Sequence, residues 1–188
     1  MQLAHRLSAL VFIASIGSAT AQETIDNQEF TNWSQYPKGT SITLKTTSTT
    51  AGVSSEATIT TTLVEVGSDK LVVEYAVVTK SGGMEFKVPP TKRDVTKTIT
   101  LPKGVEKPKD TSGKPPGTYE EGTATAKVSG MEVKTKWYKY KSEASGLKID
   151  GKIWMSDDVP GMLVRMEMKT TGTATSETKS ELVEVKKP

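Results

Sequence analysis

The chain lacks cysteine altogether and holds a single histidine, His5, among its 188 residues. Cysteine and histidine supply the usual enzymatic nucleophile, the usual proton shuttle and the best zinc ligands. Because residues 6–188 contain neither, we expect a protein that is not an enzyme, with no catalytic residue, no metal site and no cofactor. Without disulfides, its stability must come from burial and strand pairing.

The chain also has no hydrophobic run long enough to cross a membrane. The longest, residues 7–17, spans about eleven residues, whereas a membrane-spanning helix needs roughly twenty. It follows His5 and Arg6 and precedes small residues that end at Ala21, the pattern of a secretory signal peptide over residues 1–21. We therefore expect cleavage after Ala21 and export of residues 22–188 to the periplasm or the medium. A lipoprotein-type anchor is excluded because it requires a cysteine.

An excess of either charge is missing too, since 25 lysines and arginines face 22 acidic residues. A near-neutral exported domain is a poor match for nucleic acid, and we expect no such partner. Lysines do alternate with Trp137, Tyr138 and Tyr140, an arrangement that single-stranded nucleic acid or glycan binding can use. The stripe covers one strand only, so we favour solvated lysines beside partly buried aromatic residues.

Much of the chain consists of short runs rich in threonine and valine. Such β-branched residues, in short runs between turn formers, predict strands, as in residues 41–50 and 57–66. Ser81-Gly82-Gly83 and Ser129-Gly130 have the chemistry of hairpin connections. Asp150-Gly151 fits either a hairpin turn or a bulge within one strand. The sequence therefore predicts one all-β, mainly antiparallel domain over residues 22–188.

Two segments interrupt the strand pattern. Near the N-terminus, Ile25, Phe30 and Trp33 predict at most a short amphipathic helix. Residues 102–117 are rich in proline, lysine and glycine and have no apolar face, which predicts a long loop. Residues 63–66 and 182–185 share the sequence Leu-Val-Glu-Val. This repetition fits either a duplicated meander or chance similarity.

The most unusual local motif is Trp154-Met155-Ser156-Asp157-Asp158-Val159-Pro160-Gly161. Adjacent carboxylates at 157 and 158 have the ligand chemistry of calcium. Aspartate before a proline-glycine turn is also ordinary turn chemistry, and we favour that interpretation of Asp157, Asp158, Pro160 and Gly161.

Four methionines, at 155, 162, 166 and 168, cluster around this motif. Thioethers favour Cu(I), and Met166 and Met168 share one face of a predicted strand. Methionine is also a flexible filler of cores and an adaptable lining for apolar cavities. We favour the second interpretation.

Trp154, Asp157 and Pro160, followed by Val164, Arg165 and Glu167, resemble the late hairpin of periplasmic lipoprotein carriers of the LolA and LolB type. The resemblance covers Trp154 to Glu167, and the chain lacks the lid helices of those carriers. It implies a strongly curved antiparallel sheet, an incomplete barrel whose concave face holds acyl chains or another apolar ligand.

The sequence thus favours a non-catalytic exported binding module for an amphiphile, a lipid or a lipidated partner. Five residues are the candidates for lining its ligand site: Trp154, Met155, Met162, Met166 and Met168. The alternative is a structural or adhesive cell-envelope protein without a ligand cavity. The oligomeric state is left open by the sequence.

Overall fold

The computed structural model describes residues 23–101, 113–144 and 146–188, and strands make up most of them. The predicted signal peptide and most of the predicted loop at 102–117 lie outside the described residues. In chain order, the elements are β1 (Thr24–Asp26), α1 (Gln28–Trp33), β2 (Ser41–Thr50), β3 (Val53–Val66), β4 (Lys70–Ser81), β5 (Met84–Thr96), β6 (Thr98–Thr100), β7 (Thr118–Val128), β8 (Met131–Ala144), β9 (Leu147–Met155), β10 (Leu163–Thr171) and β11 (Thr175–Lys186).

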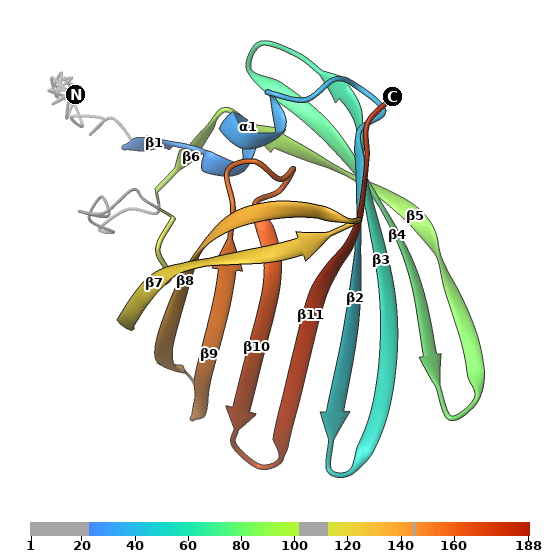
Figure 1. Cartoon of the computed structure of the whole chain (residues 1–188), viewed down its shortest axis with the longest axis vertical. Helices are drawn as coiled ribbons and strands as arrows, with labels where there is room; N and C mark the ends of the chain where they lie inside the picture. The colour runs from blue at the N-terminus through green and yellow to red at the C-terminus, as the bar shows by residue number, and fades with distance from the viewer. Residues whose placement is uncertain (1–22, 102–112, 145) are drawn as a thin grey trace, which may run out of the picture.

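Nine of these strands form a single antiparallel sheet in the order β5-β4-β3-β2-β11-β10-β9-β8-β7. The two remaining strands, β1 and β6, pair with each other. Figure 1 shows that the large sheet is strongly curved. Among the described residues its edge strands β5 and β7 do not pair, so the sheet does not close into a barrel. The predicted all-β antiparallel fold is confirmed.

Threonine and serine form rows of hydroxyl pairs across the middle of the sheet. Thr46 contacts Ser180 at 2.8 Å between hydroxyl oxygens, and Thr49 contacts Ser54 at 2.9 Å. β-Branched side chains suit the pleated backbone, and paired hydroxyls on neighbouring strands satisfy one another. The Thr-rich runs of the sequence therefore become the central strands β2, β3 and β11.

Two of the predicted hairpins are confirmed. Gly82 and Gly83 connect β4 to β5 with φ of 58° and 79°, and Ser129-Gly130 connects β7 to β8. Asp150-Gly151, by contrast, is neither a hairpin turn nor a bulge. It lies inside β9, where successive residues pair without a shift against β10.

Gly151 has a packing role that explains its place in a strand. A Cβ atom at this position would lie 2.6 Å from Cζ of Tyr140, the residue opposite it on β8. The missing side chain therefore makes room for the tyrosine ring. The prediction of a turn or a bulge at Asp150-Gly151 was wrong because glycine also occurs within strands where another group approaches the backbone closely.

The repeated Leu-Val-Glu-Val segments occupy equivalent places. Their strands, β3 and β11, flank β2 on its two sides. In each segment the strand register shifts between the leucine and the glutamate, at Leu63/Glu65 and at Leu182/Glu184. Each repeated segment therefore coincides with a register irregularity, in β3 against β4 and in β11 against β2, and such irregularities add local twist to a sheet.

Helix α1 covers one end of the sheet, where the chain between β9 and β10 also lies (Figure 1). Its N-cap is Asn27, whose side chain accepts a hydrogen bond from the Glu29 amide at 3.0 Å. Phe30 and Trp33 are buried, as the predicted amphipathic helix requires. They pack in a core with Val159 of the chain between β9 and β10 and with residues of both halves of the sheet, namely Ile42, Leu63, Leu71, Val73, Val95, Val128, Val133, Val164 and Leu182.

The β7–β8 hairpin passes in front of β9 and β10 in Figure 1, and its tip reaches β11. There the Ser129 hydroxyl donates to the Val183 carbonyl at 3.2 Å and accepts from the Val185 amide at 3.4 Å. Val128 and Val133, which flank the tip, are buried in the core. The hairpin thus folds one margin of the sheet back onto its centre.

Edge strand β5 has a different character. Met84, Phe86 and Val88 are 61%, 51% and 50% exposed. Pro89 and Pro90 follow them, at the point where the register with β4 shifts. Among the described residues the structure shows no helix with the length and apolar character needed to cross a membrane.

Candidate ligand-binding site

The motif after β9 forms a compact turn over residues 156–162. The Ser156 amide donates to the Met162 carbonyl at 2.8 Å, and the Met162 amide donates to the Val159 carbonyl at 2.9 Å. Gly161 and Met162 both have positive φ, 72° and 65°. Such a backbone suits glycine and strains methionine, while Val159 and Pro160 are buried beneath the turn.

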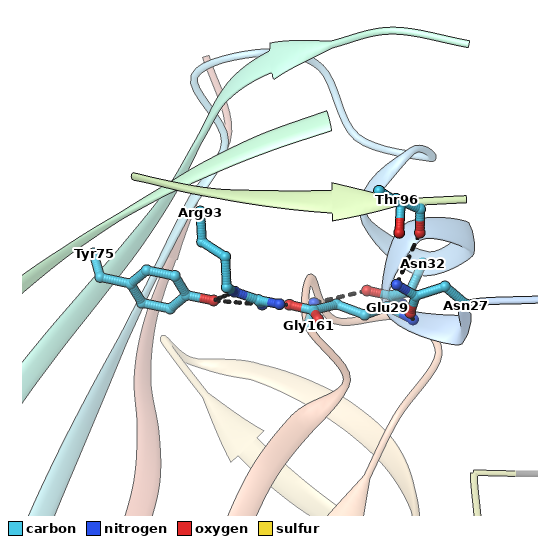
Figure 2. Close-up of polar contacts among 7 residues, drawn as sticks. All are labelled: Asn27, Glu29, Asn32, Tyr75, Arg93, Thr96 and Gly161. Atoms are coloured by element: carbon cyan, nitrogen blue, oxygen red, sulfur yellow. Dashed lines mark hydrogen bonds and ion pairs between the residues drawn. The ribbon is translucent and has the colours of Figure 1, made fainter. Parts of the chain in front are cut away.

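Asn32 of α1 holds this turn against the helix (Figure 2). Its side-chain nitrogen donates to the Asp157 carbonyl at 3.1 Å, and its side-chain oxygen accepts from the Gly161 amide at 2.7 Å. Asn32 is only 4% exposed. A buried amide with both ends satisfied fixes the position of the turn, because losing either bond leaves a buried polar group unpaired.

The other side of α1 is tied to strands β4 and β5. Arg93 donates to the Tyr75 hydroxyl at 2.7 Å and forms an ion pair with Glu29 (Figure 2). Burial lowers the pKa of Arg93, but the hydrogen bonds to Tyr75 and Glu29 outweigh it and raise the pKa overall. The helix is therefore fixed between the β4–β5 hairpin and the turn at 156–162.

A pocket of about 710 Å³ lies between the β7–β8 hairpin and this turn. Tyr138, Thr135 and Ser156 are its buried residues, and Met155 and Met162 are half-buried. The full lining consists of Thr123, Ala124, Thr125, Lys134, Thr135, Lys136, Tyr138, Met155, Ser156, Asp157, Asp158 and Met162. The least exposed part of the lining therefore combines the Tyr138 ring and the hydroxyl residues Thr135 and Ser156, with the two half-buried thioethers beside them.

The exposed rim of the pocket carries both charges. Lys134 and Lys136 extend from β8, while Asp157 and Asp158 belong to the turn. The two carboxylates also affect Tyr36, which lies outside the rim. Burial is the largest cause that raises the pKa of Tyr36, and the negative charges of Asp158 and Asp157 raise it further. Both would resist the formation of a further negative charge on the tyrosine.

The five residues predicted to line a ligand site do not all meet. Met155 and Met162 lie together in the pocket. Trp154 lines a separate depression of about 170 Å³ together with Val164 and Arg165. Adjacent residues of a strand face opposite sides of the sheet, which is why Trp154 and Met155 separate.

Met166 and Met168 alternate along β10, where they pair with Ile153 and Gly151 of β9. Both are half-buried, and Met168 borders another surface depression, between β9, β10 and β11. The pocket residues that sequence reasoning missed include the threonines and alanine of the hairpin, Tyr138 and the two rim lysines. The sequence shows that lysines alternate with aromatic residues along β8, but it does not show which face of this strand turns toward the pocket.

The other face of β8 and β9 carries a stack of cations and indole rings. Lys152 Nζ lies 4.1 Å from the ring centroid of Trp137 and 4.5 Å from that of Trp154. The Arg165 guanidinium lies 5.0 Å from the Trp154 centroid. Because the chain's own cations contact these indole rings, the aromatic stripe has an internal partner.

The described residues contain no group of three or more acidic side chains placed to hold a metal ion together. Asp157 and Asp158 are exposed, and their backbone rather than their carboxylates makes the contacts of the turn, through the Asp157 carbonyl and the Asp158 amide. The turn interpretation of these residues agrees with this geometry.

No model of a known protein family matches the chain, and neither does any curated protein. Among solved structures, the chain is similar to a DUF1329 family protein from Desulfovibrio piger, with 6% sequence identity and a TM-score of 0.25. That similarity covers 85% of this chain and 92% of the other. A TM-score of 0.25 is too low to support an argument about fold or function, so the site rests on its own geometry.

Proposed function

We propose that the protein is a non-catalytic, exported binding module that holds an amphiphilic ligand in the pocket between the β7–β8 hairpin and the turn at 156–162. The observation that carries the proposal is the lining of this pocket: an apolar part made by Tyr138, Met155 and Met162 beneath a charged rim. Small-molecule sites are typically concave and mostly apolar, with volumes of roughly 300–1,000 Å³ and a few polar groups that fix orientation.

Methionine suits such a pocket because its unbranched thioether adapts to ligands of different shape. An acyl segment of about eight methylene groups would contribute about 6 kcal/mol on burial, before the costs of ordering the ligand. The residue types of the apolar part and the rim therefore match the two ends of an amphiphile. Export is part of the proposal and rests on the sequence pattern of residues 1–21.

A structural role in the cell envelope is the second candidate. One observation favours it: Met84, Phe86 and Val88 expose apolar side chains along the edge strand β5. An exposed apolar edge is a surface for association rather than for a small ligand. The two functions differ in whether the isolated protein takes up an amphiphile.

The test is uptake of a fluorescent fatty acid by the exported protein, after native mass spectrometry for any lipid that co-purifies. We expect binding, and we expect Met155→Glu to weaken it by at least about tenfold, because a carboxylate in the apolar part must be desolvated when a chain enters.

Met84→Glu is the matched control, since it introduces the same charge at an exposed methionine on β5, away from the pocket. Its binding should equal that of the unchanged protein. The proposed function would be contradicted if the unchanged protein took up no fatty acid, or if both variants lost the same binding affinity. Either result would favour the structural role.

A further inference from the structure

The rim of the pocket separates two pairs of opposite charges. Lys134 and Lys136 are two residues apart on β8 and so point to the same side of the strand. Asp157 and Asp158 come from the turn that follows β9. All four residues border the same pocket, and all four are exposed. A ligand seated in the pocket therefore meets a cationic and an anionic side at once.

These charges do not neutralise each other. Among the described residues, no ion pair within 4.0 Å joins either rim lysine to either rim aspartate. The neighbouring lysines of the same strand behave differently: Lys139 pairs with Glu120 at 2.7 Å, and Lys141 pairs with Asp150 at 3.6 Å. The pocket thus keeps its cations and carboxylates apart, whereas the next two lysines of β8 are paired with carboxylates.

The backbone on both sides of the gap is held in place. On the acidic side, Asn32 binds the Asp157 carbonyl and the Gly161 amide. On the basic side, Lys136 is in register with Met155 of β9. These contacts fix the backbone that carries the rim residues, so the distance between the two sides of the rim is set by the fold.

Complementarity restricts the class of ligand. An anionic headgroup would be attracted by the lysines but repelled by the aspartates. A cationic headgroup would be repelled by the lysines. A neutral headgroup would be attracted by neither. A headgroup with both charges can form charge-assisted hydrogen bonds on both sides, a phosphate or carboxylate with the lysines and an ammonium with the aspartates.

We infer that the ligand of this pocket is a zwitterionic amphiphile, with its anionic group at Lys134 and Lys136, its ammonium group at Asp157 and Asp158, and its chain against Tyr138 and Met155. The inference rests on the proposed function, because it uses the same pocket and the same apolar part. It adds the chemistry of the headgroup.

The experiment compares single-chain amphiphiles with matched acyl chains, below their micelle concentrations, by isothermal titration. The zwitterion is lysophosphatidylethanolamine, the anion is lysophosphatidylglycerol, the cation is an alkyltrimethylammonium salt and the neutral probe is a monoacylglycerol. Glycerophosphoethanolamine, which has the headgroup without the chain, shows whether the charges alone suffice. We expect the zwitterionic amphiphile to bind on the order of tenfold more tightly than the others, and the chainless headgroup to bind far more weakly.

Variants should redirect this selectivity rather than abolish binding. Replacing both rim aspartates, Asp157→Asn with Asp158→Asn, should shift the preference to the anionic probe. Replacing both rim lysines, Lys134→Gln with Lys136→Gln, should shift it to the cationic probe. Lys45→Gln with Lys92→Gln, two exposed lysines on β2 and β5, is the matched control and should leave the preference unchanged.

The failures of the two proposals can be told apart. If every chain-bearing probe binds equally, or if the rim variants leave selectivity unchanged, the zwitterion inference is wrong while the amphiphile pocket stands. If the chainless headgroup binds as tightly as the lipid, the ligand is a zwitterion but not an amphiphile, which overturns the inference as stated. If no probe binds, both proposals fail.

Discussion

Asn32 shows how one side chain connects distant parts of the chain. Its two hydrogen bonds reach residues 125 and 129 positions away. The sequence drew attention to the turn at 156–162, because adjacent aspartates before a proline and a glycine have recognisable turn chemistry. It gave no sign of Asn32 as the partner, since an asparagine inside a short helix has no local feature that identifies a contact so far along the chain.

We predict that Asn32→Ala lowers the free energy of unfolding by about 2 kcal/mol, because it removes both hydrogen bonds of a buried side chain and leaves the half-buried Gly161 amide without its partner. Chemical denaturation measures this loss. The same variant should weaken amphiphile binding, because the rim aspartates lose their fixed position.

Gln35→Ala provides the control, since Gln35 follows the same helix and its side chain bonds only to the exposed end of that helix. Its effect should stay within about 0.5 kcal/mol. Equal effects of the two substitutions would show that the helix, and not the contact with the turn, is what Asn32 supports.

At the scale of elements, β8 is held by two pairs of an aromatic residue and a glycine. Trp137 lies opposite Gly122 of β7, and Tyr140 lies opposite Gly151 of β9. At both glycines a Cβ atom would come within 2.6 Å of the ring. Covering a strand glycine with an aromatic ring offsets the weakness that glycine brings to a sheet.

Gly151→Ala should therefore destabilise the protein by about 1–3 kcal/mol, because the new methyl group overlaps the Tyr140 ring and forces it to move. The backbone at Gly151 is not in the left-handed region, so strain does not contribute. In a Tyr140→Ala background the same substitution should cost much less. A thermodynamic double-mutant cycle that found additive effects would refute this coupling.

Elements that form through local interactions can be predicted from the sequence, whereas features that depend on residues far along the chain cannot. Strand runs and the hairpins at Ser81-Gly82-Gly83 and Ser129-Gly130 depend on local propensity and were predicted from the sequence. The role of Gly151 depends on Tyr140 across the sheet, and the choice of Met155 rather than Trp154 as a pocket residue depends on which face of β9 turns toward the hairpin. Neither relation is encoded in the neighbouring residues, so sequence reasoning grouped residues that the fold divides.

At the scale of the whole molecule, the curved sheet is partly closed where the tip of the β7–β8 hairpin meets β11. Ser129, at the tip of the β7–β8 hairpin, bonds to the backbone of β11 on both sides of Glu184. The hairpin also supplies one wall of the pocket. The closure of the sheet and the shape of the ligand site are therefore linked through the β7–β8 hairpin.

We predict that Ser129→Ala changes the free energy of unfolding by less than about 1 kcal/mol but speeds amide hydrogen exchange in the hairpin tip, residues 124–135. Hydrogen exchange with mass spectrometry measures this local opening. Ser54→Ala, which removes an exposed hydroxyl pair within the β2–β3 hairpin, is the control and should leave the exchange of residues 124–135 unchanged. Unchanged exchange in the Ser129 variant would mean that the buried valines alone hold the tip.

The open form of the sheet leaves β5 at an edge with an apolar stripe, a surface on which copies of a β protein can stack into filaments. Pro89 and Pro90 lie immediately after that stripe, and a proline has no amide hydrogen to offer an incoming strand. The ladder that an incoming strand would extend is thus interrupted within the same strand that attracts it. The two prolines therefore limit how far an added strand could pair along β5, although the apolar stripe beside them is exposed.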